Sequence, residues 1–198
     1  MGGAVERPFV IEPFDPERHD RKGFRCGVAA VDNYFHHTAN KLAKAGNVRL
    51  YVMAAPDGAV AGFYTLNAHA VGYEALPARY ARTRPAHGSI PAAFISMMGR
   101  DERYRGSGMG GDLLFDALAR ITRAADQIGI AVVMLDILDC GDPERVARRQ
   151  ALYEGYGFTP LPSNPRRLFL PVGTVQRLLN EPVPPVADRG NAPPGADP

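Results

Sequence analysis

Two hydrophobic periodicities divide this chain into segments. In some segments apolar residues recur three or four positions apart, which is the spacing of one helix face, and in others they gather in short uninterrupted runs. The first pattern predicts helices, and the second predicts buried or half-buried strands. Helices are predicted over residues 28–45, 110–127, 143–155 and 174–180, and strands over residues 9–11, 50–54, 60–66, 92–98, 130–138, 158–161 and 167–172.

Turn-forming residues mark several ends of these elements. Gly46 follows the first helix, where a left-handed exit favours glycine. Pro56-Asp57-Gly58 separates two apolar runs and predicts a hairpin. Asp142-Pro143 begins a later helix, with proline at its first position. Residues 73–87 combine prolines, glycine and arginines, and this composition predicts a loop with a short helical piece.

The order of these elements indicates the fold class. The predicted order is a helix, a hairpin, a strand, a helix, a strand, a helix and two closing strands. This order predicts a mixed α/β sheet in a single domain. A chain of 198 residues is long enough for one well-buried core. We assign residues 1–180 to this domain. Residues 181–198 contain six prolines and predict a disordered or loosely draped tail.

The charge is nearly balanced, but the cations are mostly arginine. The formal net charge is +2, and 20 of the 23 cationic residues are arginine. They cluster over residues 18–25, 79–84, 100–105, 145–149 and 166–167. Arginine offers bidentate geometry to phosphate. Solvated surface charge explains any one cluster equally well.

The cysteine content and the apolar runs indicate the compartment. Cys26 and Cys140 have neither a metal-like nor a disulfide-framework spacing, which favours a reducing, cytoplasmic setting. No apolar stretch approaches the length that spans a membrane, and the N-terminus lacks the apolar core of a signal peptide.

The most informative motif is Arg105-Gly106-Ser107-Gly108-Met109-Gly110, between a predicted strand and a predicted helix. Glycines at alternate positions let the backbone turn tightly and approach a bulky ligand. The converging N–H groups and the positive end of the helix dipole make such a turn an anion site, and phosphate is the usual anion. The motif therefore predicts a cofactor that bears a diphosphate.

Three motif families, and a plain helix-capping turn, compete for these glycines. A P-loop is excluded because Gly111-Asp112, not Lys-Ser/Thr, follows Gly110. A dinucleotide fingerprint fits Gly106, Gly108 and Gly111, and the next strand ends at the acidic Asp136. That fingerprint should follow its strand almost directly, whereas residues 101–105 intervene. The third candidate is Arg-x-x-Gly-x-Gly, from Arg105 to Gly110.

The Arg-x-x-Gly-x-Gly pattern resembles the pyrophosphate loop of the GNAT acetyltransferases, which bind acyl-coenzyme A. A Tyr-x-x-x-Gly-Phe element, Tyr153 to Phe158, adds to this resemblance. The block from His19 to Gly27 and the closing Arg167-Leu168-Phe169-Leu170 are similar to the GNAT toxins of bacterial type II toxin–antitoxin modules. Those toxins acetylate the amino group of aminoacyl-tRNA. The resemblance covers roughly residues 9–180.

Two segments depart from the toxin pattern. The toxins usually show an Arg-Leu-Ala-type strand before the loop, where this chain has Ser96-Met97-Met98-Gly99-Arg100. The segment 140–149 is also longer than the usual link into the tyrosine helix. Both flank the expected acceptor cleft, so the resemblance fixes the cofactor better than the acceptor.

The resemblance implies a GNAT fold, acetyl-CoA as the acetyl donor, no metal, and a primary amine as acceptor, most simply that of aminoacyl-tRNA. It also implies a ribbon-helix-helix antitoxin as a partner and a homodimer. Tyr153 takes the place of the family's general acid, and a tyrosine pKa near 10 is close to that of an alkyl thiol. The residues expected to contact the cofactor are the main chain of Met98 and Arg100, together with Arg105, Gly106, Ser107, Gly108, Met109 and Gly110.

Other polar residues have weaker claims. Tyr153 itself could be a packing residue on the sheet. No acid occurs in residues 94–98, where many acetyltransferases keep a general base, and Glu74 and Glu102 are the alternatives, unless water removes the amine proton. The adjacent His36 and His37 point to different helix faces, which argues against a metal site. The two cysteines lack a supporting histidine pattern, which favours buried thiols over nucleophiles.

The sequence leaves several function classes open. The leading one is a toxin that acetylates charged tRNA. The others are an acetyltransferase for a small amine or a protein amino group, a non-catalytic acyl-CoA-binding module, and the dinucleotide-binding protein described above. A tRNA acceptor would need arginines beside the acetyl-binding cleft. The candidates are Arg79, Arg82, Arg84, Arg100, Arg103, Arg148 and Arg149.

Overall fold

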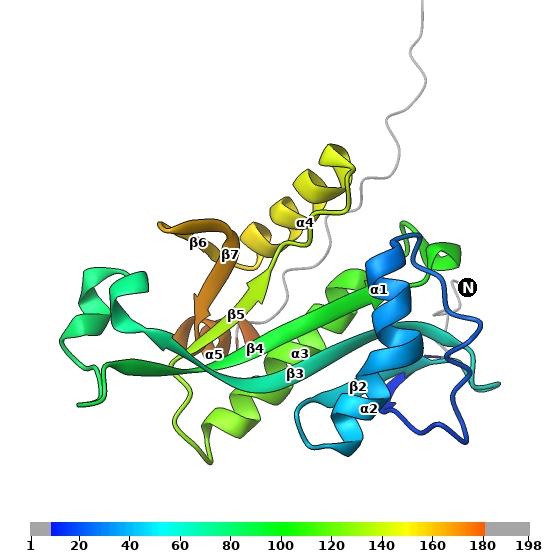
Figure 1. Cartoon of the computed structure of the whole chain (residues 1–198), viewed down its shortest axis with the longest axis horizontal. Coiled ribbons are helices and arrows are strands. Elements are labelled where there is room, and N and C mark those ends of the chain that lie inside the picture. The colour runs from blue at the N-terminus through cyan, green and yellow to red at the C-terminus, as the bar shows by residue number, and fades with distance from the viewer. Residues whose placement is uncertain (1–8, 181–198) are drawn as a thin grey trace, which may run out of the picture.

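A computed structural model of the chain describes residues 9–180, which form one seven-stranded mixed sheet flanked by helices (Figure 1). The strands lie in the order β1-β2-β3-β4-β5-β7-β6, and only the β4–β5 pair is parallel. The strands are β1 (Val10–Pro13), β2 (Arg49–Ala54), β3 (Val60–Gly72), β4 (Ser89–Arg100), β5 (Val132–Asp136), β6 (Thr159–Leu161) and β7 (Asn164–Pro171). The predicted mixed α/β sheet is confirmed.

The helices follow the predicted apolar periodicity. The predicted helix 28–45 is one helical column in three parts, in which a π-helical stretch, η1 (Tyr34–Thr38), joins α1 (Ala29–Asn33) to α2 (Ala39–Lys44). The other helices are α3 (Met109–Ala125), α4 (Pro143–Gly155) and α5 (Val172–Asn180). Short 3-10 turns occur at η2 (Tyr73–Ala75), η3 (Ala78–Ala81) and η4 (Glu102–Tyr104).

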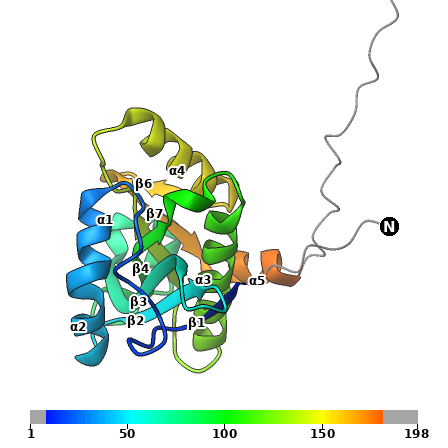
Figure 2. The same cartoon turned by 90° about the vertical axis from the view of Figure 1, so that its right-hand side faces the viewer.

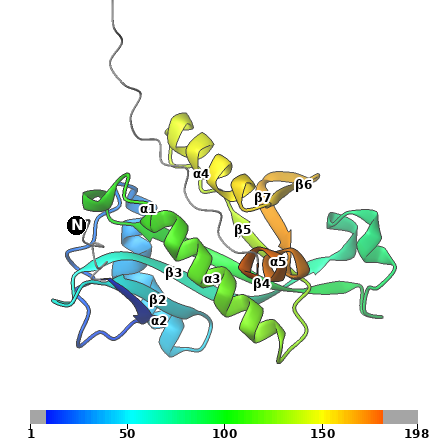
Figure 3. The same cartoon turned by 180° about the vertical axis from the view of Figure 1, so that it is seen from behind.

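The helices cover the two faces of the sheet unequally. α3 and α5 lie on one face, and α1 with α2 lies on the other (Figures 2 and 3). The apolar stripe of α3, which includes Leu113, Leu114 and Leu118, is buried in the larger core. The opposite core gathers aromatic rings, and Phe35 stacks on Phe63 with ring centroids 4.2 Å apart. Burial of these leucine side chains on one face, and of the aromatic rings on the other, supplies most of the attraction between the helices and the sheet.

The segment 73–88 closes one end of the sheet. It connects β3 to β4, contains η2 and η3, and packs Leu76 against Val71 and Ile90. Tyr80 meets Phe169 edge-on, with ring centroids 6.2 Å apart. The predicted loop with a short helical piece is therefore confirmed. This segment lies at the N-terminal end of β4, whereas the glycine motif follows its C-terminal end, and the twelve residues of β4 span about 40 Å.

β4 and β5 pair over only part of their lengths. Their register runs from Ala92 opposite Val132 to Ile95 opposite Leu135 and then stops. β4 continues to Arg100 paired with β3 alone. Figure 1 shows β5 leaving the direction of β4, and we refer to this place as the β4–β5 divergence.

A β-bulge coincides with the divergence. Leu66 of β3 lies opposite Ile95 and Thr65 lies opposite Met97, so Ser96 is an extra residue in β4. Its hydroxyl is 2.9 Å from that of Thr65. Bulges bend a strand and increase its local twist. The bulge at Ser96 therefore gives a local reason why β4 turns away from β5 just after Ile95.

Several boundaries differ from the prediction. β3 extends six residues beyond the predicted Leu66, because polar Asn67 and His69 interrupt the apolar run but still pair with β4. β5 ends at Asp136 instead of residue 138. The predicted tail 181–198 lies outside the described residues. Within residues 9–180, no helix has the length and apolar character needed to cross a membrane.

Candidate functional site

The turn formed by residues 105–110, called the glycine turn below, begins α3. Gly106 and Gly108 have φ angles of +82° and +81°, and Gly108 is the N-cap of the helix. Only glycine adopts such angles without strain. Apart from adjoining residues and the helix's own backbone, no atom of the described chain lies within 4 Å of the position that a Cβ would take at Gly106, Gly108 or Gly110. The N–H groups of the first turn of a helix lack partners within the helix. At the start of α3 these groups lie beside an open turn, which suits the binding of an anion.

Two arginines add positive charge beside this turn. Arg105 is exposed, and Arg100 is half-buried with its Nη1 donating to the carbonyl of Asp101 at 3.2 Å. Burial lowers the pKa of Arg100, and the neighbouring charge of Arg105 lowers it further. Two guanidinium groups this close repel each other, and a bound dianion would relieve that repulsion.

Asp101 fixes the loop between β4 and the glycine turn, a role that the sequence did not reveal. Its buried carboxylate accepts from the backbone N–H of Arg25 at 3.0 Å and from Nε and Nη2 of Arg103 at 2.8 and 3.1 Å. Burial alone would raise the pKa of Asp101, but these donors hold it below its ordinary value. Arg103 is thus already paired, and the carboxylate of Asp101 offsets its positive charge.

Tyr153 lies on the inner face of α4 and is 9% exposed. Its ring meets Phe158 edge-on at a centroid distance of 6.0 Å. Among residues 9–180 its hydroxyl has no hydrogen-bond partner. Burial raises the pKa of Tyr153, and the charge of Arg149 opposes that rise. The ring is therefore packed, yet the hydroxyl keeps its proton and its bonding capacity, as a proton donor requires.

Two arginines tie α4 to neighbouring segments of the chain. Arg149, one helical turn before Tyr153, donates from Nη1 to the carbonyl of Leu138 at 3.1 Å, just after β5. Arg145 donates from Nη1 to the carbonyl of Gly27 at 3.1 Å, so that α4 also contacts the segment before α1. A Cβ at Gly27 would lie 3.2 Å from a carboxylate oxygen of Glu102. Residues 27, 102 and 145 thus meet at one place.

Tyr156 has a different environment from Tyr153. Its hydroxyl donates to the carbonyl of Gly111 at 3.2 Å, which joins α4 to the first turn of α3. Burial raises its pKa, with a smaller effect from Asp112. This contact agrees with the packing role expected for Tyr156.

The two acids considered as general bases are widely separated. Glu102 is exposed in η4, close to the glycine turn. Glu74 is exposed in η2, at the opposite end of β4. The structure therefore places only Glu102 near the divergence.

The two cysteines are partly and not fully buried, which corrects the expectation of buried thiols. Burial and the nearby Asp32 raise the pKa of the Cys26 thiol to about 12, and Asp32 accepts from the backbone N–H of Cys26 at 2.8 Å. His36 Nε2 lies 3.0 Å from the carbonyl of Phe24. No group of three His, Cys, Asp or Glu side chains within residues 9–180 is arranged to hold a metal ion.

The arginines proposed for RNA do not share one region. Arg79, Arg82 and Arg84 lie in the segment 73–88, at the opposite end of β4 from the glycine turn, so they are separate from Arg100 and Arg103. The antiparallel β3–β4 hairpin requires this, because its connection lies where β4 begins. Arg148 is exposed and pairs with Glu144 at 3.4 Å.

Asp136, the acid that a dinucleotide fingerprint would use, already has a partner. Nε and Nη2 of Arg167, which lies directly opposite on β7, each approach one of its carboxylate oxygens at 2.7 Å. A bidentate pair of this kind occupies the oxygens that a ribose would need. The geometry therefore disfavours the dinucleotide hypothesis.

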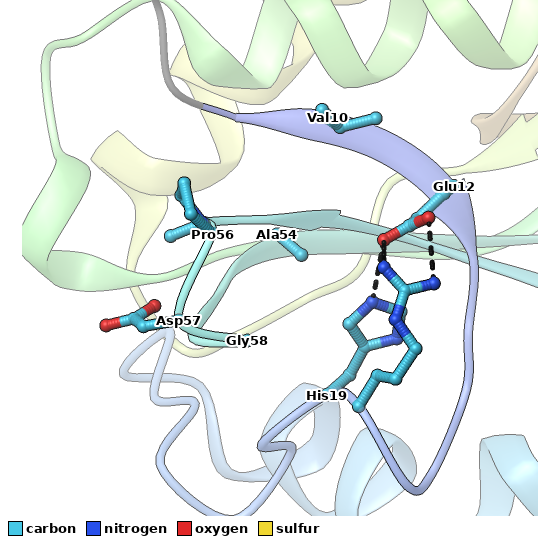
Figure 4. Close-up of a pocket in the computed structure, with 9 residues that line it drawn as sticks. Val10, Glu12, His19, Ala54, Pro56, Asp57 and Gly58 are labelled. Carbon is cyan, nitrogen blue, oxygen red and sulfur yellow. Dashed lines mark hydrogen bonds and ion pairs between the residues drawn. The ribbon is translucent and has the colours of Figure 1, made fainter.

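One hollow of the described surface lies at the edge of the sheet. It measures about 400 Å³ and is bordered by β1 and the β2–β3 turn (Figure 4). The buried His19 accepts the backbone N–H of Asp15 at Nδ1, so Nε2 carries the hydrogen and donates to Glu12 at 3.0 Å. Arg18 pairs with the same carboxylate at 2.9 Å. These groups satisfy one another, and the hollow lies at the sheet edge, two strands away from β4.

Comparison with known sequences identifies close relatives. The chain is 61% identical over 178 residues to the probable toxin TacT of Sinorhizobium fredii, covering 89% of this chain and 97% of the relative. It is 30% identical over 162 residues to a tRNA-acetylating toxin of Mycobacterium tuberculosis, covering 82% and 92% of the two chains. No protein-family model matches the chain.

Comparison with solved structures supports the same fold. AtaT complexed with acetyl-methionyl-tRNAfMet superposes with a TM-score of 0.75 at 23% identity, covering 86% of this chain and 99% of AtaT. A tyrosine-to-phenylalanine variant of AtaT, bound to the C-terminus of the antitoxin AtaR and to acetyl-CoA, gives a TM-score of 0.72 at 21% identity. That match covers 88% of this chain and 99% of the other.

Proposed function

The chain belongs to the family of tRNA-acetylating toxins, and from that premise we propose that it transfers acetyl from acetyl-CoA to the amino group of an aminoacyl-tRNA. One structural observation carries the proposal most strongly. The β4–β5 divergence leaves part of a central strand, β4 beyond Ile95, unpaired on the side that faces β5, between the glycine turn and the helix of Tyr153. The RNA complex of the similar AtaT supports the same acceptor.

Two groups of residues would hold the donor. The turn from Arg105 through Gly106, Ser107, Gly108 and Met109 to Gly110 suits the diphosphate, because it combines open N–H groups with arginine charge. Beyond Ile95 the main chain of β4 has no partner in β5, so Met98 and Arg100 can offer backbone groups to the amide-bearing arm of the donor. Bound acetyl-CoA in the similar AtaT structure supports the identity of the donor.

Tyr153 would act as the general acid. The amine nitrogen forms a bond to the carbonyl carbon of the thioester, and the carbon–sulfur bond then breaks. Tyr153 gives its hydroxyl proton to the departing sulfur, and the surplus proton of the amine passes to water. β4 contains no Asp or Glu that could serve as a base. The ester-linked amine of an aminoacyl group is less basic than that of lysine, so water suffices.

The biological setting follows from the same premise. We propose an antitoxin partner, since AtaT binds the C-terminus of AtaR, and we expect a ribbon-helix-helix type from the resemblance. We also propose a homodimer and a cytoplasmic site of action, where charged tRNA is found. Sedimentation of the purified protein tests the dimer.

Salt dependence of turnover separates the tRNA acceptor from a small amine. RNA binding that uses phosphate contacts weakens steeply with salt, so kcat/KM for charged tRNA should fall between 50 and 200 mM salt, by about tenfold or more if several phosphates are contacted. Turnover that hardly responds to salt, with small amines as the better acceptors, would support an ordinary acetyltransferase. Donor binding without any transfer would support a non-catalytic module.

A further inference from the structure

A row of three side chains crosses the sheet beside the β4–β5 divergence. His69 of β3 and Phe94 of β4 have ring centroids 5.2 Å apart, and the guanidinium carbon of Arg167 on β7 lies 5.5 Å from the centroid of Phe94. The side chains of His69, Phe94 and Arg167 are each only partly buried. The row therefore presents aromatic and guanidinium surface that the helices do not fully cover.

The position of Phe94 in the fold is unusual for a phenylalanine. Phe94 lies on β4, a central strand of the sheet, and its partly buried ring packs against the cluster that contains Val71, Leu76 and Ile90. Its neighbour Ile95 is the last β4 residue that pairs with β5, one Cα step of about 3.8 Å away. The Arg167 guanidinium lies over this ring and His69 lies beside it, so a substrate that approaches the divergence would meet the surface that these three side chains together leave uncovered.

The charge of Arg167 is already balanced. Its Nε and Nη2 are 2.7 Å from the two carboxylate oxygens of Asp136, and that hydrogen bonding raises the pKa of Arg167. A guanidinium fixed in this way is a poor phosphate ligand, because Asp136 cancels its charge. It remains a rigid flat surface. The chemistry therefore favours a flat, uncharged partner over an anion.

We propose that His69, Phe94 and Arg167 form a stacking platform for an unpaired base at the 3′ end of the acceptor RNA. The proposal rests on the proposed function. Proteins recognise unpaired RNA ends by stacking bases on aromatic rings and on arginine planes. The base next to the aminoacyl group must lie close to the divergence when the amine reacts, and the platform begins one residue from it.

Replacing Phe94 and varying the acceptor tests the platform. Phe94→Leu keeps an apolar side chain and removes the ring, and Phe94→Tyr keeps the ring. The matched control is Phe115→Leu, since Phe115 is 46% exposed on α3, on the other face of the sheet. The acceptors are charged tRNA, an aminoacylated trinucleotide with the 3′-terminal sequence of tRNA, and an amino acid methyl ester.

We expect Phe94→Leu to lower kcat/KM about 10-fold to 100-fold for both nucleotide-bearing acceptors, which corresponds to the loss of one stacked base. Its kcat/KM for the methyl ester and its KM for acetyl-CoA should stay within about twofold of wild type. Phe94→Tyr and Phe115→Leu should behave as wild type with every acceptor.

Two results would overturn the platform alone. One is an equal loss with the methyl ester, which would make Phe94 part of the amino acid pocket or of the fold. The other is wild-type turnover by Phe94→Leu on both RNA acceptors. Failure of the wild-type protein to acetylate either RNA acceptor would instead overturn the proposed function itself.

Discussion

The two ends of β4 have similar sequences nearby and different structures. Each is flanked by arginines and glycines, but at the N-terminal end β4 is paired on both sides, from Ala92 onward with β5. At the C-terminal end the pairing with β5 has stopped, and a glycine turn follows. Both ends are rich in arginine, but only at the C-terminal end does β4 lack a partner on its β5 side. The unpaired β4 backbone, and not the density of arginines, therefore distinguishes the candidate site from the other end of the strand.

The arginines at the two ends also differ in their partners. At the C-terminal end Arg103 is held by Asp101, and Arg100 and Arg105 lie close enough to repel each other. At the N-terminal end Arg84 stacks over Tyr73, 4.5 Å from its ring centroid, and within residues 9–180 neither Arg82 nor Arg84 has an ion-pair partner. The arginines at the C-terminal end therefore surround the glycine turn. Those at the N-terminal end are available to a part of a large RNA that lies far from the reacting group.

The largest expected effect concerns Tyr153. Tyr153→Phe keeps the buried ring and removes the proton, so turnover should fall by about 10² to 10⁴ while acetyl-CoA binding is retained. Tyr156→Phe is the matched control, because it loses only the bond to the Gly111 carbonyl, and its turnover should change by less than about threefold. Single-turnover kinetics and calorimetry of donor binding measure both. Near-normal turnover of Tyr153→Phe would leave Tyr153 as a packing residue.

The next effect concerns the glycine turn. Gly108→Val forces a branched side chain into a left-handed conformation at the mouth of the anion site, so acetyl-CoA affinity should fall at least about tenfold. Gly46→Val is the control, since Gly46 has a φ of +76° and equally open surroundings at the end of α2. It should lower the melting temperature similarly and leave donor affinity unchanged. Stabilisation by NAD in place of acetyl-CoA would revive the dinucleotide hypothesis.

A smaller effect is expected at the other end of β4. If RNA reaches segment 73–88, Arg82→Ala with Arg84→Ala should reduce the slope of log affinity for charged tRNA against log salt by up to about 2, without changing acetyl-CoA affinity. As the control, Arg18→Ala with Arg123→Ala removes the same charge from residues outside the candidate set, one paired with Glu12 and one exposed on α3, and should leave the slope unchanged. An unchanged slope in the first double variant would show that the RNA does not extend to that end.

The smallest effect is expected at Cys26. Because its pKa is raised to about 12, the thiol stays protonated from pH 6 to 9, and the thiolate fraction rises tenfold per pH unit without reaching a plateau. In a Cys140→Ser background, iodoacetamide should therefore label Cys26 slowly at pH 8 in the folded protein and rapidly in denaturant. Cys26→Ser should keep wild-type turnover. Rapid native labelling with loss of activity would make Cys26 a functional thiol.

The sequence predicted the elements well and their spatial relations less well. Helix α3 was predicted from the local stripe of Leu113, Leu114 and Leu118, and helix α4 from the local cap at Asp142. Both helices are present in the structure. The glycine turn was also local, because alternate glycines before a helix have few other uses. The π-helical stretch Tyr34–Thr38 has no such signal, since its residues fit an ordinary helix equally well.

What the sequence missed depends on strand register. The bulge at Ser96 and the last pair, Ile95 with Leu135, appear only when β3, β4 and β5 are aligned. The row of His69, Phe94 and Arg167 joins residues almost 100 positions apart, so no sequence window contains it. The separation of the segment 73–88 arginines from Arg100 and Arg103 has the same origin, because it follows from the β3–β4 hairpin and not from composition.

The most direct test of the account is transfer of label from acetyl-CoA to RNA. Wild-type protein and Tyr153→Phe are incubated with labelled acetyl-CoA and either charged or deacylated bulk tRNA, and the aminoacyl ends are released and identified. The account predicts N-acetylated amino acid from charged tRNA with wild type alone, and no label on deacylated tRNA. Label on deacylated tRNA, or equal labelling by Tyr153→Phe, would contradict it.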